Sequence, residues 1–148
     1  MSSVSASIDI PAAPAEVWAI LMDPRKLGDW VTIHRKLLAH DQGPPTVGYR
    51  MDQRIHLKGV SVDVHWRLVE CEPPLHATWE GRGPARSRAR TQYTLHEAPG
   101  GATHFEYRNE FHPALGPVGA LAGRVLAGGM PEREAVRSLD RLCAIFES

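Results

Sequence analysis

The sequence has few of the features that would indicate several common classes of protein. It contains two cysteines in 148 residues, Cys71 and Cys143, too far apart for a metal-binding or redox motif. We interpret both as buried thiols in a reducing compartment and expect a cytoplasmic location. No apolar run is long enough to cross a bilayer, and no charged-then-apolar segment follows Met1. We therefore expect neither stable membrane insertion nor a signal peptide.

An excess of charge of one sign is missing as well. The chain has 17 basic and 17 acidic residues, a formal net charge of zero and a pI near 7.1. A balanced chain produces no global field that would attract nucleic acid, so we expect no nucleic-acid partner. The motifs of nucleophile elbows, phosphate loops, dinucleotide sites and paired catalytic carboxylates are also absent. The sequence thus indicates no particular reaction, and no cofactor is expected.

The chain does contain a series of segments in which apolar and polar residues alternate, as in half-buried strands. Turns rich in glycine and proline separate them, and they cover residues 4–10, 33–41, 47–58, 60–72, 76–82, 87–97 and 102–112. Two short helices are predicted between the first two strands, the second opened by Asp23 and Pro24. Short connections imply an antiparallel sheet with one dry face.

The end of the chain, residues 117–148, has apolar residues at helical spacing opposite a charged side. Residues 128–131 (GGMP) interrupt this helix, so we expect a kink or break and a second helical segment from about Pro131. The predicted fold class is α+β. It consists of a seven-stranded antiparallel sheet curled around a long C-terminal helix, with two short helices after the first strand, in a single domain spanning residues 1–148.

Several segments together resemble the START-like (SRPBCC) superfamily, also called the helix-grip fold, in its bacterial polyketide cyclase/dehydrase and lipid-transport branch. The resemblance rests on the C-terminal helix, on Asp23-Pro24 and Trp30, and on residues 7–18 (SIDIPAAPAEVW), 66–74 (WRLVECEPP) and 91–109. It implies a pocket between sheet and helix for a hydrophobic or amphipathic small molecule. Members of the superfamily include ligand carriers, cyclases, hydrolases and non-enzymatic partners of other proteins, so the fold does not select among them.

If the apolar strand faces point inward, a few polar groups and aromatic rings point inward with them. With the resemblance, this predicts a ligand-binding set of Trp30, Tyr49, Gln53, Trp66, Trp79, Thr91, Tyr93, Tyr107, Asn109, Leu121 and Val125. The alternative is that Gln53 and Asn109 are core residues bonded to backbone, and that the tyrosine hydroxyls lie at the sheet edge.

Eight histidines are present, but none has the spacing of metal ligands, and we expect no metal site. Alternation places five of them on outer faces. His34 is different because it lies near the expected pocket mouth after Trp30. It is therefore the weak candidate for a catalytic acid or base, without a visible carboxylate partner.

The arginines at positions 82, 86, 88 and 90 form a basic run, and alternation puts the last three on one outer face. Glu106 and Glu110 are expected on the same face of the next strand. Cross-strand ion pairs would then explain much of this run, and a phosphate or RNA surface is the second choice.

Three functions remain open. The first is binding of a hydrophobic or aromatic small molecule, lipid-like or polyketide-like. The second is a cofactor-independent polyketide aromatase/cyclase, and the third is a non-enzymatic accessory or interaction module. A homodimer is left open as well.

Overall fold

The computed structural model describes residues 2–113 and 130–147. The helices are α1 (Pro14–Leu21), α2 (Leu27–Trp30) and α4 (Glu132–Ile145), with 3-10 turns η1 (Pro24–Lys26), η2 (Pro84–Arg86) and η3 (Pro99–Gly101). The strands are β1 (Ser2–Ile10), β2 (His34–His40), β3 (Arg50–Leu57), β4 (Val60–Glu72), β5 (His76–Arg82), β6 (Arg88–Ala98) and β7 (Ala102–His112). The α+β class, the seven strands and the short helices between the first two strands are confirmed.

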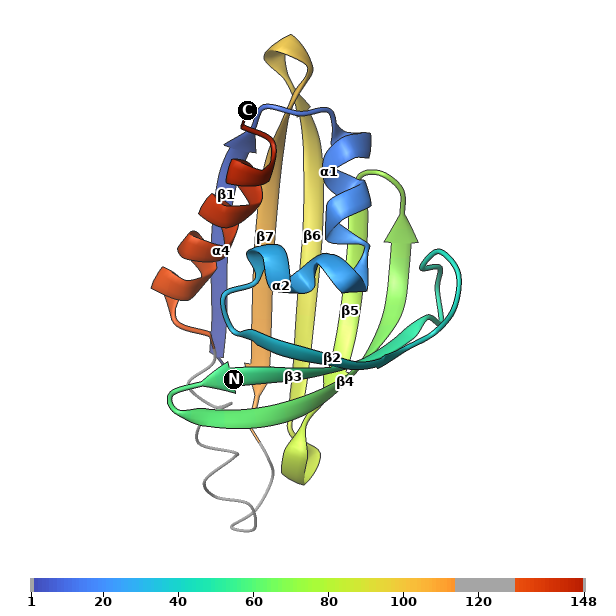
Figure 1. The fold of residues 1–148 in the computed structure, drawn as a ribbon, viewed down its shortest axis with the longest axis vertical. Coiled ribbons are helices and arrows are strands. Elements are labelled where there is room, and N and C mark those ends of the chain that lie inside the picture. The colour runs from blue at the N-terminus through green and yellow to red at the C-terminus, as the bar shows by residue number, and fades with distance from the viewer. Residues whose placement is uncertain (1, 114–129, 148) are drawn as a thin grey trace.

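The seven strands form one antiparallel sheet in the order β1-β7-β6-β5-β4-β3-β2. Consecutive strands from β2 to β7 are joined as hairpins, while β1 pairs with the last strand, β7. Figure 1 shows the sheet bending so that β2, β3 and the first part of β4 run across the long strands. This bend, which follows from strand twist, makes one face of the sheet concave.

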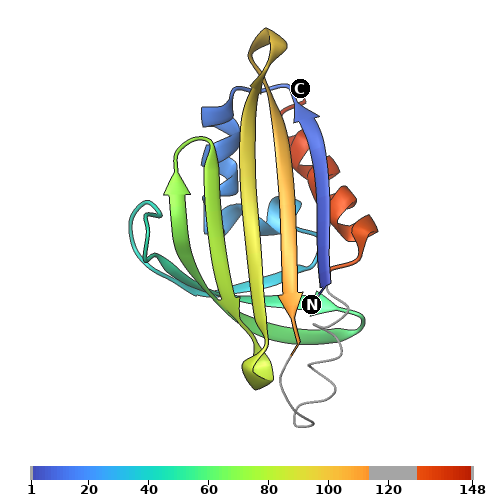
Figure 2. The ribbon, with the colours of Figure 1, turned by 180° about the vertical axis from the view of Figure 1, so that it is seen from behind.

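All three helices lie on the concave face, and the opposite face carries none in the described part of the chain (Figures 1 and 2). The C-terminal helix, around which the sheet was predicted to curl, is therefore not alone in covering this face. Helix α4 packs on the edge strand β1, α1 packs on β6 and β7, and α2 packs on α4. The reason is that the short helices carry fully apolar inner sides: Val17, Leu21, Leu27 and Trp30 are each at most 4% exposed.

The helical segment predicted from about Pro131 is confirmed. Pro131 has extended backbone and directly precedes α4, whose first turn carries Glu132 and Glu134. Carboxylates there interact favourably with the positive end of the helix dipole. The earlier part of the predicted helix, residues 117–129, lies outside the described residues. No helix in the described ranges is long and apolar enough to cross a membrane.

Strand β2 departs from clean alternation. It is mostly exposed, and its pairing with β3 shifts register twice. Bulges of this kind are common at sheet edges, where they limit pairing with other chains. Burial alternates along β3, β6, β7 and most of β4, as predicted. In β5 three successive residues, Ala77 to Trp79, are buried, and the pairing of β4 with β5 shifts register between Leu68 and Glu70.

A buried hydroxyl ties α4 to the loop before β2. Ser138 is fully buried, its Oγ accepts a hydrogen bond from the Thr32 backbone N–H at 3.0 Å, and it donates to the Glu134 carbonyl at 2.8 Å. Thr32 Oγ1 also donates to the Glu134 carbonyl, at 3.2 Å. These bonds hold α4 against the segment that follows α2.

Replacing Ser138 by alanine should therefore destabilise the protein by about 1–3 kcal/mol, because it leaves the Thr32 N–H without its acceptor. Urea unfolding followed by circular dichroism measures this change. The exposed Arg141→Ala on the same helix is the control, with an expected effect within about 0.5 kcal/mol. Equal effects of the two substitutions would show that the buried hydroxyl contributes nothing specific.

Candidate functional site

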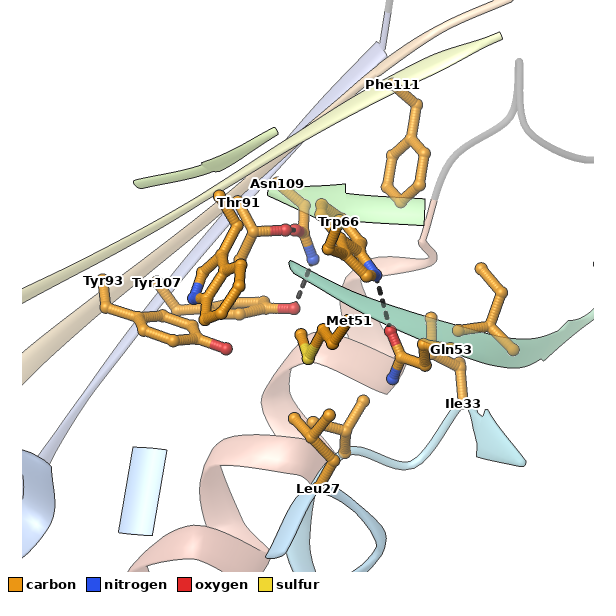
Figure 3. Close-up of a pocket in the computed structure, with 13 residues that line it drawn as sticks. Leu27, Ile33, Met51, Gln53, Trp66, Thr91, Tyr93, Tyr107, Asn109 and Phe111 are labelled. Carbon is orange, nitrogen blue, oxygen red and sulfur yellow. Dashed lines mark hydrogen bonds between the residues drawn. The ribbon is translucent and has the colours of Figure 1, made fainter. Parts of the chain in front are cut away.

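A pocket lies between the concave face of the sheet and the α2 region (Figure 3). Its volume is about 40 Å³, and its walls come from α2, the following loop and strands β3 to β7. The lining residues are Leu27, Val31, Ile33, Met51, Gln53, Ile55, Trp66, Trp79, Thr91, Tyr93, Tyr107, Asn109 and Phe111. This volume has room for roughly three water molecules, so a larger occupant requires lining side chains to move.

One wall carries a chain of polar side chains. Thr91 and Asn109 face each other across β6 and β7, and Thr91 Oγ1 donates a hydrogen bond to Asn109 Oδ1. The Asn109 amide donates to Tyr107 Oη and also lies 3.3 Å from the Met130 sulfur. Asn109 and Tyr107 are at most 5% exposed. The network satisfies the polar groups of this wall within an apolar surrounding.

The aromatic rings form a cluster beside this network. Tyr93 and Tyr107 stack with ring centroids 6.0 Å apart, and Trp30 contacts both rings edge-on. Burial raises the pKa of Tyr107 to about 12 and raises the pKa of Tyr93 well above its usual value. Both phenols therefore remain neutral hydrogen-bond donors at physiological pH. Figure 3 shows their hydroxyls pointing the same way, toward Met51.

A second polar chain ends at His34. The indole N–H of Trp66 donates to Gln53 Oε1 at 2.9 Å, and Gln53 Nε2 lies 2.9 Å from His34 Nδ1. Because an indole nitrogen can only donate, the amide must turn its oxygen to Trp66 and its NH₂ group to the histidine. His34 Nδ1 is then an acceptor, and the neutral ring carries its proton on Nε2. Burial lowers the pKa of His34, which favours the same neutral form.

Gly81 makes room for Trp66. The two residues are cross-strand partners on β5 and β4. A Cβ atom at Gly81 would lie 2.8 Å from Trp66 Cε3 and 2.7 Å from Val64 Cγ1, closer than real contacts allow. The Trp66 indole therefore lies over Gly81. It can form part of the pocket wall only because Gly81 has no side chain.

Seven of the eleven candidate ligand-binding residues line the pocket: Gln53, Trp66, Trp79, Thr91, Tyr93, Tyr107 and Asn109. Trp30 and Tyr49 lie behind it, Trp30 against the tyrosine rings and Tyr49 edge-on to Trp79. Leu121 and Val125 fall outside the described residues. The apolar lining from α2 and its loop, Leu27, Val31 and Ile33, was missed because a four-residue helix gives almost no periodic signal.

The alternative holds for Tyr49, whose hydroxyl donates to the Asp41 carbonyl beside the edge strand β2 at 2.9 Å, but not for the other polar residues. Gln53 and Asn109 bond side chains rather than backbone, and the hydroxyl-bearing rings of Tyr93 and Tyr107 are buried rather than at the sheet edge. Met130, two residues before α4, joins the network through its sulfur. Spacing along the sequence could not have linked it to Asn109.

On the opposite face, histidines and acids are paired differently from the prediction. Glu106 lies 3.4 Å from His96 Nε2, and Glu110 lies 3.1 Å from Arg108 Nε. The predicted pairs of these two glutamates with the arginines of the basic run do not form. Arg90 instead approaches Glu70 and Glu80, on the other side of β6.

The chain belongs to the family described as polyketide cyclase / dehydrase and lipid transport, whose model matches residues 1–147. Toxin Rv0910 of Mycobacterium tuberculosis is 25% identical over 149 residues, which cover 99% of each chain. Protein CV1439 from Chromobacterium violaceum has a TM-score of 0.69 and 22% identity, and covers 100% of this chain and 99% of its own. The Aha1 dimer from Colwellia psychrerythraea has a TM-score of 0.64 and 15% identity, with 99% and 97% covered. At these identities the two structures show a shared fold alone.

Acidification should destabilise the protein through His34. The folded-state pKa of His34 is lowered below the ordinary 6.5. Its contribution to the free energy of unfolding is therefore fully present above pH 6.5. It is lost progressively as the pH falls from about 6.5 through the folded-state pKa, because the unfolded chain takes up the proton more readily. Protonation at Nδ1 also removes the acceptor of the Gln53 NH₂ group.

Urea unfolding of the wild type and of His34→Asn between pH 8 and pH 5 measures this contribution. The Asn oxygen can still accept from Gln53 but does not titrate, so the variant should lose less stability on acidification. Parallel pH profiles of the two proteins would contradict the assignment.

Gly81→Ala should cost about 1–3 kcal/mol, the usual range for overpacking a core. It should also change tryptophan fluorescence, because Trp66 must move. Gly28→Ala is the matched control: its Cβ would lie 3.5 Å from His34 Cδ2, an ordinary contact. If Gly81→Ala left both stability and fluorescence unchanged, Trp66 would not depend on the glycine.

Proposed function

We propose that the protein binds a hydrophobic or aromatic small molecule, lipid-like or polyketide-like, in the pocket between the concave face of the sheet and the α2 region. The predicted cavity lay between the sheet and the C-terminal helix, but no residue of α4 lines this pocket. The observation that carries the proposal is the pocket itself: apolar and aromatic walls surround two hydrogen-bonded polar chains, ending at Tyr107 and His34. Ligand sites usually combine an apolar lining with a few fixed polar groups. The family's description, polyketide cyclase / dehydrase and lipid transport, agrees with such an occupant.

The polar groups limit the chemistry of the ligand. The phenols of Tyr93 and Tyr107 stay neutral, so they offer hydrogen bonds without charge. The His34 ring, which bonds the pocket residue Gln53, is neutral as well. Since none of these groups carries a charge at neutral pH, an uncharged ligand with acceptor oxygens fits better than an ion, which would lose its hydration without a partner.

The small volume of the pocket bears on how a ligand gets in. Drug-sized ligands occupy roughly 300–1,000 Å³, whereas this pocket has about 40 Å³. Binding therefore requires an outward displacement of lining side chains. Leu27 and Val31 are the natural candidates, because they belong to a four-residue helix and its C-terminal cap rather than to the sheet.

The first experiment is native mass spectrometry of the purified protein against its denatured mass. A reproducible mass excess that disappears on denaturation is the expected result and identifies the cargo. In parallel, binding of the uncharged aromatic probe N-phenyl-1-naphthylamine is followed by fluorescence. Val31→Phe fills the pocket and should weaken probe binding at least tenfold, whereas Val136→Phe, on the exposed side of α4, should not.

Ile55→Phe, from the sheet side of the pocket, serves as a second filling variant if Val31→Phe unfolds. The proposal would be overturned if the purified protein carried no bound molecule and if neither Val31→Phe nor Ile55→Phe weakened binding of the probe.

Two alternatives remain under this proposal. A cofactor-independent aromatase/cyclase would use His34, Tyr107 and Asn109 as proton-transfer or carbonyl-binding groups, and DynU16, from the dynemicin biosynthetic locus, shares the fold with a TM-score of 0.61. An accessory or interaction module is favoured by the small pocket, and a relative in fold is a dimer. We propose a cytoplasmic location for all three.

A further inference from the structure

The face of the sheet opposite the helices carries an ordered grid of charged side chains. Two rows run across β3 to β7 and are set by the strand register. The first row is Arg50, Arg67, Glu80, Arg90 and Glu110, and the second is Asp52, His65, Arg82, Arg88 and His112. All ten residues line one open hollow of about 590 Å³ on the face seen in Figure 2.

The register places two pairs of like charges directly opposite each other. Arg50 faces Arg67 across β3 and β4, and Arg82 faces Arg88 across β5 and β6. We call these four residues the arginine face. Like charges in this position are destabilising, so the arrangement costs stability unless something else neutralises it.

Carboxylates of this chain do not neutralise the arginine face. Among residues 2–113 and 130–147, no carboxylate lies within 4.0 Å of any of its four guanidinium groups. The nearby acids are engaged elsewhere: Asp52 with His65 at 2.8 Å, Glu80 with Arg90 at 3.7 Å and Glu110 with Arg108 at 3.1 Å. Residues 114–129 contain no acidic side chain that could serve instead.

We propose that the arginine face is a binding surface for the phosphate backbone of a double-helical nucleic acid. The balanced net charge argued against such a partner, but it describes the chain as a whole and not the local distribution of charge on this face. Guanidinium groups bind phosphates through two parallel N–H···O bonds. An anion that lies between two guanidinium groups can bind both and offsets their mutual repulsion.

The spacing of the two arginine pairs favours an extended polyanion over a small one. The pairs are offset by two strands and two residues, which corresponds to about 12 Å between their centres. A diphosphate, whose phosphorus atoms share one bridging oxygen, cannot reach both. A duplex carries about one phosphate per 1.7 Å of axis and can contact both pairs at once.

The surroundings disfavour the other polyanions. A protein partner with acidic groups needs apolar anchors at the centre of the interface. Ten of the fourteen residues that line this hollow are charged or histidine; of the other four, Trp66, Gly81 and Ala89 are buried and Val69 is half-buried. A single strand without sequence preference is held by exposed aromatic rings on which bases stack. Trp66 is the aromatic residue bordering the hollow, and it is only 8% exposed. Contact with a duplex backbone needs neither feature.

The test is fluorescence anisotropy with labelled 20-base-pair DNA and RNA duplexes over a range of salt concentrations. Four phosphate contacts predict a slope of log K against log salt of about −3 to −4. Arg67→Ala/Arg82→Ala should weaken binding at least tenfold and make the slope shallower by about two. Binding of either duplex with this salt dependence supports the proposal.

The matched control is Arg25→Ala/Arg54→Ala, which removes the same charge from two arginines that have carboxylate partners at 3.1 and 2.8 Å. It should change affinity less than twofold. Thermal melts check that each variant is folded. If Arg67→Ala/Arg82→Ala does not fold, Arg50→Gln/Arg88→Gln is used in its place.

Three results would overturn the proposal. One is the absence of duplex binding at low salt, and another is an equal loss of affinity in the control. The third is binding of polyglutamate or of a single strand at least as tight as that of the duplex. The pocket experiments above are independent of this test, since they concern the other face of the sheet.

Discussion

The pleat of the antiparallel sheet is the constraint on which the rest of the structure depends. Because successive side chains point to opposite faces, each strand from β3 to β7 contributes one row to the interior and one row to solvent. The same register that brings Thr91 opposite Asn109 in the pocket brings Arg82 opposite Arg88 on the outer face. A one-residue slip would exchange both sets, so core and surface chemistry are specified together.

Burial sets the chemistry of the inner face. Polar groups there are tolerated because they bond one another, as Thr91, Asn109 and Tyr107 do. The same burial keeps the tyrosines neutral and lowers the pKa of His34. The outer face has the opposite character, since its charged side chains are in contact with water and two pairs of arginines lie directly opposite each other there. The proposed small-molecule site and the proposed nucleic-acid surface thus use the two environments that one sheet creates.

Much of the fold could be predicted, because alternation and helical spacing are local properties of the chain. The strands, the two short helices and the helical segment after Pro131 all followed from such patterns, and so did seven of the pocket residues. Errors arose where partners come from elsewhere in the chain. The coverage of the sheet by α1 and α2, the contribution of Met130 and the partners of Glu106 and Glu110 depend on packing between distant segments.

The sequence by itself determined which residues alternate between the two faces, where turns interrupt the strands and that the charges balance overall. Only the tertiary structure decided which residues meet. The direction of the Gln53 amide, and with it the proton position on His34, required knowing that Trp66 lies on the next strand. The unpaired state of the arginine face likewise required the register of five strands. The physical reason is that hydrogen bonds and ion pairs act over a few ångströms, while the residues that form them are far apart along the chain.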